Sequence, residues 1–204
     1  IRDLVRSRGL GDVYKRQVVA ALKGSERALY LVHSMSATRN FAEAEQKIAK
    51  NFVEVSDEVG LKQLVYLGGL GPDDVEKSAH LQSRQAVGRI LASGSTPVTE
   101  LRAAVIIGSG SASFEMLRSL VEVLPFMVVP KWVTKTKCQP ISIGNVLENL
   151  LSVLGREEAF NKVFEIGGPE VVTYREMMDT YAEVAGLKSC LLYTSDAADE
   201  GLGV

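Results

Sequence analysis

Two apolar runs that end in glycines constrain the fold of this chain more than any other feature. The first, at 64–71, reads Leu-Val-Tyr-Leu-Gly-Gly-Leu-Gly, and the second, at 98–108, ends in Ile-Ile-Gly. Both are typical of strands buried on both faces, and the segment between them has the length of one helix. A strand, a crossover helix and a second strand form a right-handed βαβ unit, so the sequence predicts a parallel sheet. Ligands of such sheets bind at the carboxyl ends of the strands, which places the expected site at Gly68, Gly69 and 104–110.

The spacing of apolar residues predicts the remaining elements. A strand is expected at 28–32, and a helix at 41–59 that ends at Gly60, where a left-handed residue stops it. Past residue 110 the pattern is less regular, and helices and short strands are expected at 114–124, 127–129, 140–143, 146–154, 163–166 and 174–185. Asn145 is a candidate cap for one of these helices, and Thr173 with Glu176 matches a capping box for the last.

The two ends of the chain differ in character from its middle. Residues 1–17 and 190–204 resemble translated sequencing-adapter read-through, which recurs at the ends of assembled environmental fragments. We therefore expect both ends to be non-native tails. The alternative is a genuine basic arm at the N-terminus and a genuine acidic tail at the C-terminus. Between them we expect a first part at 18–110 and a C-terminal part at 111–189.

Composition argues against several functional classes. The chain of 204 residues is 46% hydrophobic and 24% charged, with a net charge of −2, which gives no reason to expect nucleic acid or a membrane as a partner. Its apolar stretches are too short and too broken to cross a bilayer. With Cys190 in a tail, Cys138 stands alone, which excludes an internal disulfide and fits a reducing cytoplasm. Spacings typical of metal ligands are absent from the sequence.

Several short segments, in order along the chain, together resemble one family. They are His-Ser-Met at 33–35, Val-Tyr-Leu-Gly-Gly-Leu-Gly at 65–71, His-Leu-Gln-Ser-Arg at 80–84, Leu-Arg-Ala-Ala at 101–104, Cys-Gln-Pro-Ile at 138–141, Ile-Gly-Gly-Pro at 166–169 and Thr-Tyr-Arg-Glu at 173–176. The chain resembles an atypical short-chain dehydrogenase/reductase. The most similar branch is the NAD(P)H-binding group that includes NmrA-like regulators and proteins related to an accessory subunit of respiratory NADH dehydrogenase.

The resemblance implies an α/β fold. It predicts a Rossmann-like parallel sheet at 18–110 with NAD or NADP at the strand ends, and a small α+β substrate-side region at 111–189. In this family a first strand and a glycine-rich turn, which wraps the pyrophosphate, precede every segment found here. Gly9 and Gly11 do not replace that turn, because they follow no strand and open no apolar-periodic helix. We therefore expect a fragment that lacks the first strands and whose binding of the cofactor is in doubt.

The candidate catalytic residues are His80 and Arg84. They occupy the positions at which typical family members carry Tyr-x-x-x-Lys, where the lysine lowers the pKa of the tyrosine. Four residues apart on one helix face, a histidine with a reference pKa of about 6.5 could act as acid or base, and the arginine could anchor the ribose. The alternative is structural, with His80 on the strand-end surface and Arg84 bound to a phosphate or carboxylate, because arginine stays charged and cannot relay protons.

Residues that follow the predicted strands are the candidate cofactor contacts. His33 could contact ribose or adenine, or could make a single backbone hydrogen bond in a turn. Gly68 and Gly69 would let backbone amides approach a ligand, or would serve a tight turn of positive φ. The predicted cofactor-binding residues are His33, Ser34, Met35, Gly68, Gly69, Arg84, Ala104 and Val105.

Three other features favour structural roles. Arg102 lies within a strand two positions from Glu100, so an ion pair between them is expected rather than a substrate contact. The lysine-rich segment 131–137 around Trp132 could be a substrate lid or a basic patch, but an edge strand or loop is the simpler interpretation. Cys138 has no activating histidine near it in sequence, which indicates an inert thiol.

The sequence leaves three hypotheses open. The first is an NAD(P)-dependent oxidoreductase or isomerase that acts on a small organic substrate in its full-length form. The second is a non-catalytic NAD(P)H-sensing regulator or assembly factor, and the third is an inactive fragment unable to bind the cofactor. We expect a cytoplasmic protein whose partners are a dinucleotide and a small molecule rather than nucleic acid, with no membrane span. The oligomeric state stays open.

Overall fold

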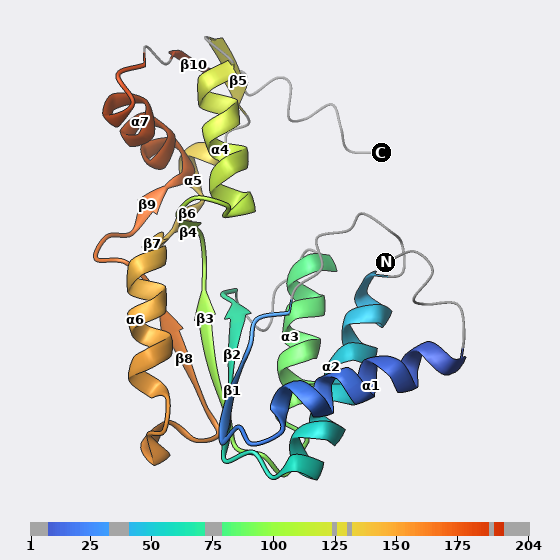
Figure 1. Cartoon of the computed structure of the whole chain (residues 1–204). Helices are drawn as coiled ribbons and strands as arrows, with labels where there is room; N and C mark the ends of the chain where they lie inside the picture. Colours follow the sequence, from blue (N-terminus) through green and yellow to red (C-terminus); the bar gives the residue numbers. More distant parts are fainter. Residues whose placement is uncertain are drawn as a thin grey trace. The chain divides into compact units, whose positions relative to one another are not determined.

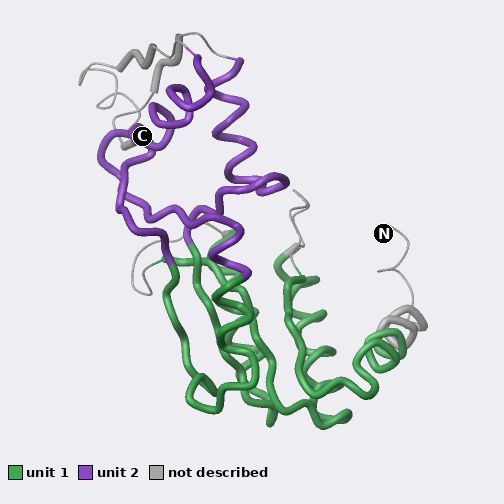
Figure 2. The backbone as a smooth tube through the Cα atoms, turned by 60° about the vertical axis from the view of Figure 1, so that its left-hand side comes forward, with its two compact units in different colours: residues 1–103, 148–166 green, residues 104–147, 167–204 purple. Residues whose placement is uncertain are grey.

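The computed structural model describes residues 8–32, 41–71, 79–123, 126–129, 132–187 and 190–193. The chain divides into two compact units (Figure 2). Unit 1 comprises residues 1–103 and 148–166, and unit 2 comprises residues 104–147 and 167–204. The sequence placed one division near residue 110. The segment 148–166 joins unit 1 because its strand pairs with the main sheet.

The centre of unit 1 is a four-stranded sheet in the order β1-β2-β3-β8 (Figure 1). The strands are β1 (Arg27–Tyr30), β2 (Gln63–Gly69), β3 (Val98–Ala103) and β8 (Lys162–Ile166). All three neighbouring pairs are parallel. The helices of this unit are α1 (Arg8–Leu22), α2 (Phe41–Val59), α3 (Ala79–Leu91), the single-turn η1 (Glu157–Ala159) and the end of α6 (Ile143–Val153). This arrangement confirms the predicted parallel, Rossmann-like α/β sheet.

The two faces of the sheet are held in different ways. On one face Tyr30 and Tyr66 lie in an apolar core with Phe52 of α2, and the Tyr30 and Phe52 rings meet edge to face at 5.0 Å. On the other face Gln63, which is fully buried, donates to Thr99 Oγ1 at 2.9 Å and to Val153 O at 3.0 Å. Buried polar groups need such partners, so these bonds attach the end of α6 to the sheet.

Unit 2 is built from short elements. They are β4 (Ile106–Ile107), α4 (Ala112–Val123), β5 (Phe126–Val129), α5 (Trp132–Lys135), β6 (Lys137–Cys138), β7 (Ile141–Ser142), β9 (Val172–Thr173), α7 (Tyr174–Val184) and β10 (Cys190–Tyr193). β4 pairs with β7 and β5 with β10, both in parallel, whereas β6 and β9 are antiparallel. Leu117 and Val121 of α4 pack against Met177 and Met178 of α7 in one apolar core. The helix α1 begins within the predicted N-terminal tail and β10 lies within the C-terminal one, and the origin of both tails stays a prediction.

Most predicted elements are confirmed, and three expectations are wrong. The segment 131–137, expected as an edge strand or loop, contains the helix α5 at Trp132–Lys135. The single strand expected at 98–107 is interrupted, since β3 ends at Ala103 and β4 pairs within unit 2. Asn145 does not cap α6. Its own backbone N–H donates to Ser142 Oγ at 3.1 Å, so Ser142 is the capping residue. The capping box of Thr173 and Glu176 is present as predicted. In the part of the chain that the structure describes, no helix is long and apolar enough to cross a membrane.

Asp57 at the end of α2 fastens the loop between α3 and β3. Its carboxylate accepts hydrogen bonds from the backbone amides of Ser95 and Thr96, with the Thr96 amide at 3.0 Å, and from the Thr96 hydroxyl at 3.1 Å. Partial burial raises the pKa of Asp57, but the hydrogen bonds from Ser95 and Thr96 outweigh it, and the pKa lies below its usual value.

We expect the free energy of unfolding to fall less steeply at acid pH in Asp57→Asn than in the parent chain. The pKa of Asp57 is lower in the folded chain than in the unfolded chain. Its stabilisation is therefore complete above the unfolded value, about pH 4, and is lost as the pH falls through the folded value. Urea unfolding at neutral pH and at steps below about pH 4 should show a smaller loss for Asp57→Asn than for the parent chain. Glu165→Gln on β8 is the control, and an equal flattening by both variants would contradict the assignment.

Candidate functional site

The carboxyl ends of β1, β2 and β3 lie at one edge of the sheet because the three strands are parallel. β1 is followed by Leu31 and Val32, whose side chains are 51% and 46% exposed. β2 ends at Gly69, and the next residue, Leu70, donates its amide to Ala103 O at 2.8 Å. This edge therefore presents apolar side chains, glycine backbone and the end of a fixed strand pair.

The predicted cofactor residues are distributed unevenly over this edge. His33, Ser34 and Met35 lie outside the described residues. Ala104 and Val105 directly follow β3 and are the first residues of unit 2. The Val105 side chain lies in the apolar core of that unit, and its carbonyl accepts a hydrogen bond from the Ile141 amide at 2.9 Å. Contact of these residues with a cofactor stays a prediction.

Gly68 makes room for a carboxylate. A Cβ at Gly68 would lie 2.6 Å from Glu100 Oε1, and a Cβ at Gly88 on α3 would lie 2.9 Å from Glu100 Oε2. Gly69 differs, because its Cβ would meet Leu81 Cδ1 at 3.0 Å. Neither Gly68 nor Gly69 has a positive φ, so the tight-turn alternative is wrong for both. The absence of side chains at Gly68 and Gly88 leaves the space between β2 and α3 that the buried Glu100 carboxylate occupies.

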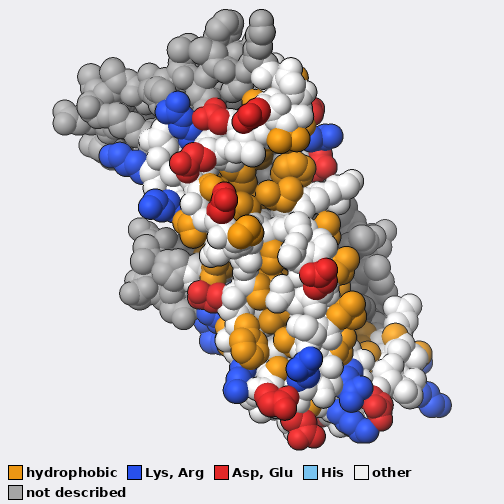
Figure 3. Space-filling model, turned by 90° about the vertical axis from the view of Figure 1, so that its left-hand side faces the viewer, with side chains coloured by type: hydrophobic (Ala, Val, Ile, Leu, Met, Phe, Trp, Pro, Cys, Tyr) orange, Lys and Arg blue, Asp and Glu red, His pale blue; other side chains and the backbone are white. Residues whose placement is uncertain are grey.

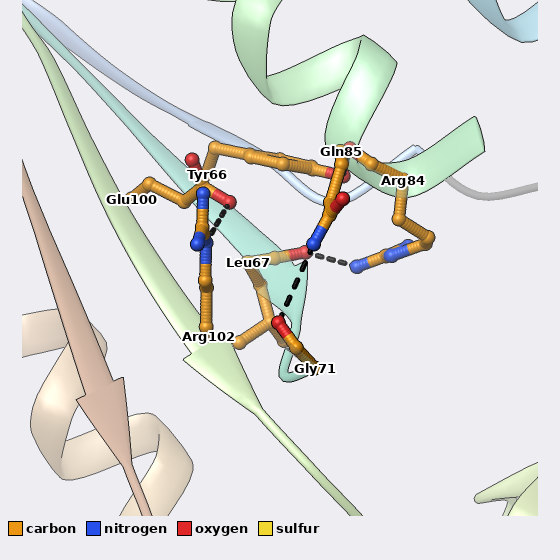
Figure 4. Close-up of polar contacts among 7 residues, drawn as sticks. All are labelled: Tyr66, Leu67, Gly71, Arg84, Gln85, Glu100 and Arg102. Carbon is orange, nitrogen blue, oxygen red and sulfur yellow. Dashed lines mark hydrogen bonds and ion pairs between the residues drawn. The ribbon is translucent and has the colours of Figure 1, made fainter. Parts of the chain in front are cut away.

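Glu100 and Arg102 form the predicted ion pair on β3. Arg102 Nε donates to Glu100 Oε1 at 2.9 Å, and the two side chains are only 18% and 10% exposed (Figure 4). Both project from the same face of the strand, since they are two residues apart. Burying a carboxylate without such a partner costs free energy, so the ion pair with Arg102 keeps the Glu100 side chain in its position beside Gly68.

Arg84 points towards the end of β2. Its Nη2 donates to the Leu67 carbonyl, and its guanidinium carbon lies 5.5 Å from the centroid of the Tyr66 ring (Figure 4). In return, the Tyr66 hydroxyl donates to Arg84 O at 3.0 Å. The structural alternative placed Arg84 on a phosphate or carboxylate, whereas the described group that it binds is a backbone carbonyl. Arg84 therefore fastens α3 to the carboxyl end of β2.

Two titratable side chains near this edge differ in what they can do. Burial raises the pKa of Tyr66 to about 12, so its phenol keeps its proton at neutral pH. His80 lies in the first turn of α3, four residues before Arg84, and its side chain is exposed. The Tyr66 side chain is therefore closed to a ligand, whereas the His80 side chain is open to one. A catalytic role for His80 and Arg84 stays a prediction.

Sequence reasoning missed the buried polar side of α3. Ser83 donates to Glu45 Oε2 of α2 at 2.5 Å, and the Gln85 side chain reaches Gly71 O at 3.5 Å. Both side chains are buried, at 3% and 5% exposure. The available signal was the small number of apolar residues in this helix. A helix of this kind buries polar side chains when it packs against a sheet, and buried polar side chains need hydrogen-bond partners. Within the described ranges, no group of three or more His, Cys, Asp or Glu side chains could hold a metal ion.

Comparison with known proteins identifies the fold. No protein-family model and no curated protein matches the chain. Among solved structures, a short-chain dehydrogenase/reductase superfamily protein from Agrobacterium tumefaciens with bound NAD matches with a TM-score of 0.71 and 12% identity, over 90% of this chain and 73% of that chain.

Two further structures agree. A Bordetella bronchiseptica enzyme in complex with NAD gives a TM-score of 0.71 and 14% identity, over 92% of this chain and 64% of that one. The UDP-glucose 4-epimerase of Thermotoga maritima with UDP-glucose also gives 0.71 and 14%, over 90% of this chain and 68% of that one. The fold is therefore that of the short-chain dehydrogenase/reductase structures, in agreement with the resemblance found in the sequence.

Proposed function

We propose that this chain is the dinucleotide-binding part of an NAD(P)-binding protein of the short-chain dehydrogenase/reductase type. The observation that carries the proposal is the parallel sheet whose strands end together at an edge formed by Val32, Gly69 and Ala103. Open parallel sheets bind their ligands at such an edge. Structures with the same fold contain NAD, although their identity to this chain is only 12% to 14%.

The residues at the edge suit the flat, apolar parts of a dinucleotide. Leu31 and Val32 present an exposed apolar surface on which a base or a nicotinamide ring could lie. Gly69 ends β2 at this edge, and Arg84 beside it has five N–H donors, of which the Leu67 carbonyl takes one. When bound, NAD(P) would supply the hydride chemistry, and these residues would hold and orient it.

For the full-length protein we propose an oxidoreductase that acts on a small organic substrate, with His80 as proton donor or acceptor. One observation favours the second candidate, an NAD(P)H-sensing regulator without turnover. Arg84 occupies the position of the family's lysine, but its guanidinium is engaged by the Leu67 carbonyl and the Tyr66 ring. It therefore lacks the freedom of a lysine to assist proton transfer.

Calorimetric titration of the 204-residue chain with NAD and NADP tests the binding site. We expect Val32→Asp to weaken dinucleotide binding about tenfold, because it puts a carboxylate, which is costly to desolvate, against the ring that Val32 would contact. The control is Val163→Asp on the opposite edge strand, where the side chain is 51% exposed. Equal effects of the two variants would place the cofactor elsewhere. The absence of heat from a folded chain with either cofactor would favour the inactive fragment.

His80→Ala separates the two active candidates. In the full-length protein, loss of turnover with unchanged cofactor affinity would support the oxidoreductase, because a proton donor acts only in the reaction. A full-length protein that binds NAD(P)H yet turns over none of a panel of aldehydes, ketones and alcohols would support the sensor. Loss of cofactor affinity in His80→Ala would instead assign the residue to binding.

A further inference from the structure

The outer edge strand of the unit 1 sheet exposes apolar side chains on both of its faces. In β8, Val163 is 51% exposed and Phe164 is 38% exposed. The inner edge of β8 pairs with β3, and no strand among the described residues pairs with its outer edge. An edge strand of this kind has backbone donors and acceptors available for another strand.

A groove of about 550 Å³ lies beside Phe164. Its apolar lining comes from Val153 at the end of α6, Ala159 of η1 and Phe164 itself. Figure 3 shows this side of the molecule, and in its lower part hydrophobic side chains gather above a border of charged ones. The groove can therefore take one apolar side chain of an incoming strand.

The rim of the groove has an excess of positive charge. Arg156 and Lys162 line it together with Glu158, which gives two cations against one carboxylate. Neither Arg156 nor Lys162 forms an ion pair within the described part of the chain. Such unpaired cations beside an apolar floor complement carboxylates on either side of an apolar residue.

We propose that β8 and this groove bind an extended acidic segment of a partner protein. The segment adds to β8 as a strand, places an apolar side chain against Phe164 and presents carboxylates to Arg156 and Lys162. Lys162 is the first residue of β8, so the groove lies near the amino ends of the parallel strands, whereas the proposed dinucleotide site lies at their carboxyl ends. The two proposals are therefore independent.

Fluorescence anisotropy of a labelled peptide, acetyl-Glu-Asp-Val-Phe-Val-Asp-Glu-amide, with the full chain tests the proposal. We expect the double variant Arg156→Glu, Lys162→Glu to bind this peptide at least tenfold more weakly and to bind a version with lysines in place of the acids more tightly than the parent chain does. The control pair Lys23→Glu, Lys50→Glu, which changes exposed lysines of the same unit, should leave the affinity within a factor of about two.

Three results would overturn the proposal. Equal binding of the acidic and the lysine peptide by the parent chain, or no binding of either, would contradict recognition of an acidic segment by Arg156 and Lys162. Equal binding of two further peptides, one with proline in place of the first aspartate and one with proline in place of the first valine, would exclude strand addition. One of two consecutive residues must donate to β8, and proline cannot. A concentration-dependent dimer in sedimentation that Val163→Lys abolishes would show that a second copy of the chain occupies this edge instead.

Discussion

Arg102→Met is expected to destabilise unit 1 by about 3 kcal/mol, because it leaves the Glu100 carboxylate buried without its partner. The two side chains are 18% and 10% exposed, and the distance from Arg102 Nε to Glu100 Oε1 is 2.9 Å. Methionine keeps most of the length and apolar surface of the arginine stem, so the loss comes from the charge rather than from packing. Chemical denaturation followed by far-ultraviolet circular dichroism measures the change.

The double variant Glu100→Met, Arg102→Met distinguishes the contribution of the ion pair from that of the packing around it. Replacing both members of a buried ion pair by apolar residues is often close to neutral, so we expect the double variant to be more stable than Arg102→Met alone. The carboxylate lies in the space left by Gly68 and Gly88, and methionine can follow the same path without a charge. Additive losses in the two single variants would contradict a direct coupling of Glu100 with Arg102.

Patterns of local spacing predicted the elements of unit 1 well. The buried strands and the helix over 41–59 follow from the periodicity of apolar residues. This periodicity is a property of each segment's own sequence and needs no knowledge of distant contacts. Helix ends could be predicted for the same reason. Gly60, Gly155 and Gly186 all have a positive φ, of 71°, 76° and 67°, as a left-handed stop requires.

Long-range packing explains what the sequence could not predict. The role of Gly68 depends on Glu100, which lies on the neighbouring strand 32 residues later in the chain and two residues before Arg102, the register partner of Gly68. The direction of Arg84 depends on the Leu67 carbonyl, an acceptor that every residue type supplies equally. The strand expected at 98–107 ends at Ala103, and the Val105 carbonyl that follows accepts a hydrogen bond from the Ile141 amide. The residues near 104 give no indication of this distant partner. Function-related positions are set by such contacts between distant segments, whereas the elements themselves are set locally.

Gly168→Ala is expected to destabilise unit 2 by about 3 kcal/mol through a clash with the main chain. The Gly168 amide donates to Pro140 O at 3.0 Å, and a Cβ at this position would lie 2.3 Å from the same oxygen. The obstacle is a carbonyl of the backbone rather than the tip of a flexible side chain. The methyl group must therefore push two segments apart and break their hydrogen bond. The chain's single tryptophan, Trp132, lies in α5 of unit 2, so its fluorescence during urea unfolding follows this unit.

Gly144→Ala is the matched control, and its change in the free energy of unfolding should have the opposite sign to that of Gly168→Ala. Gly144 lies in α6, has no positive φ, and a Cβ there would meet only Ser142 Oγ at an ordinary 3.8 Å. Alanine is favoured over glycine in a helix by up to about 1 kcal/mol, so this variant should be more stable than the parent chain. Equal responses of the two variants would mean that Gly168 is not constrained by Pro140. A loss confined to Gly168→Ala requires the close approach of the two backbone segments, because both changes add the same single methyl group.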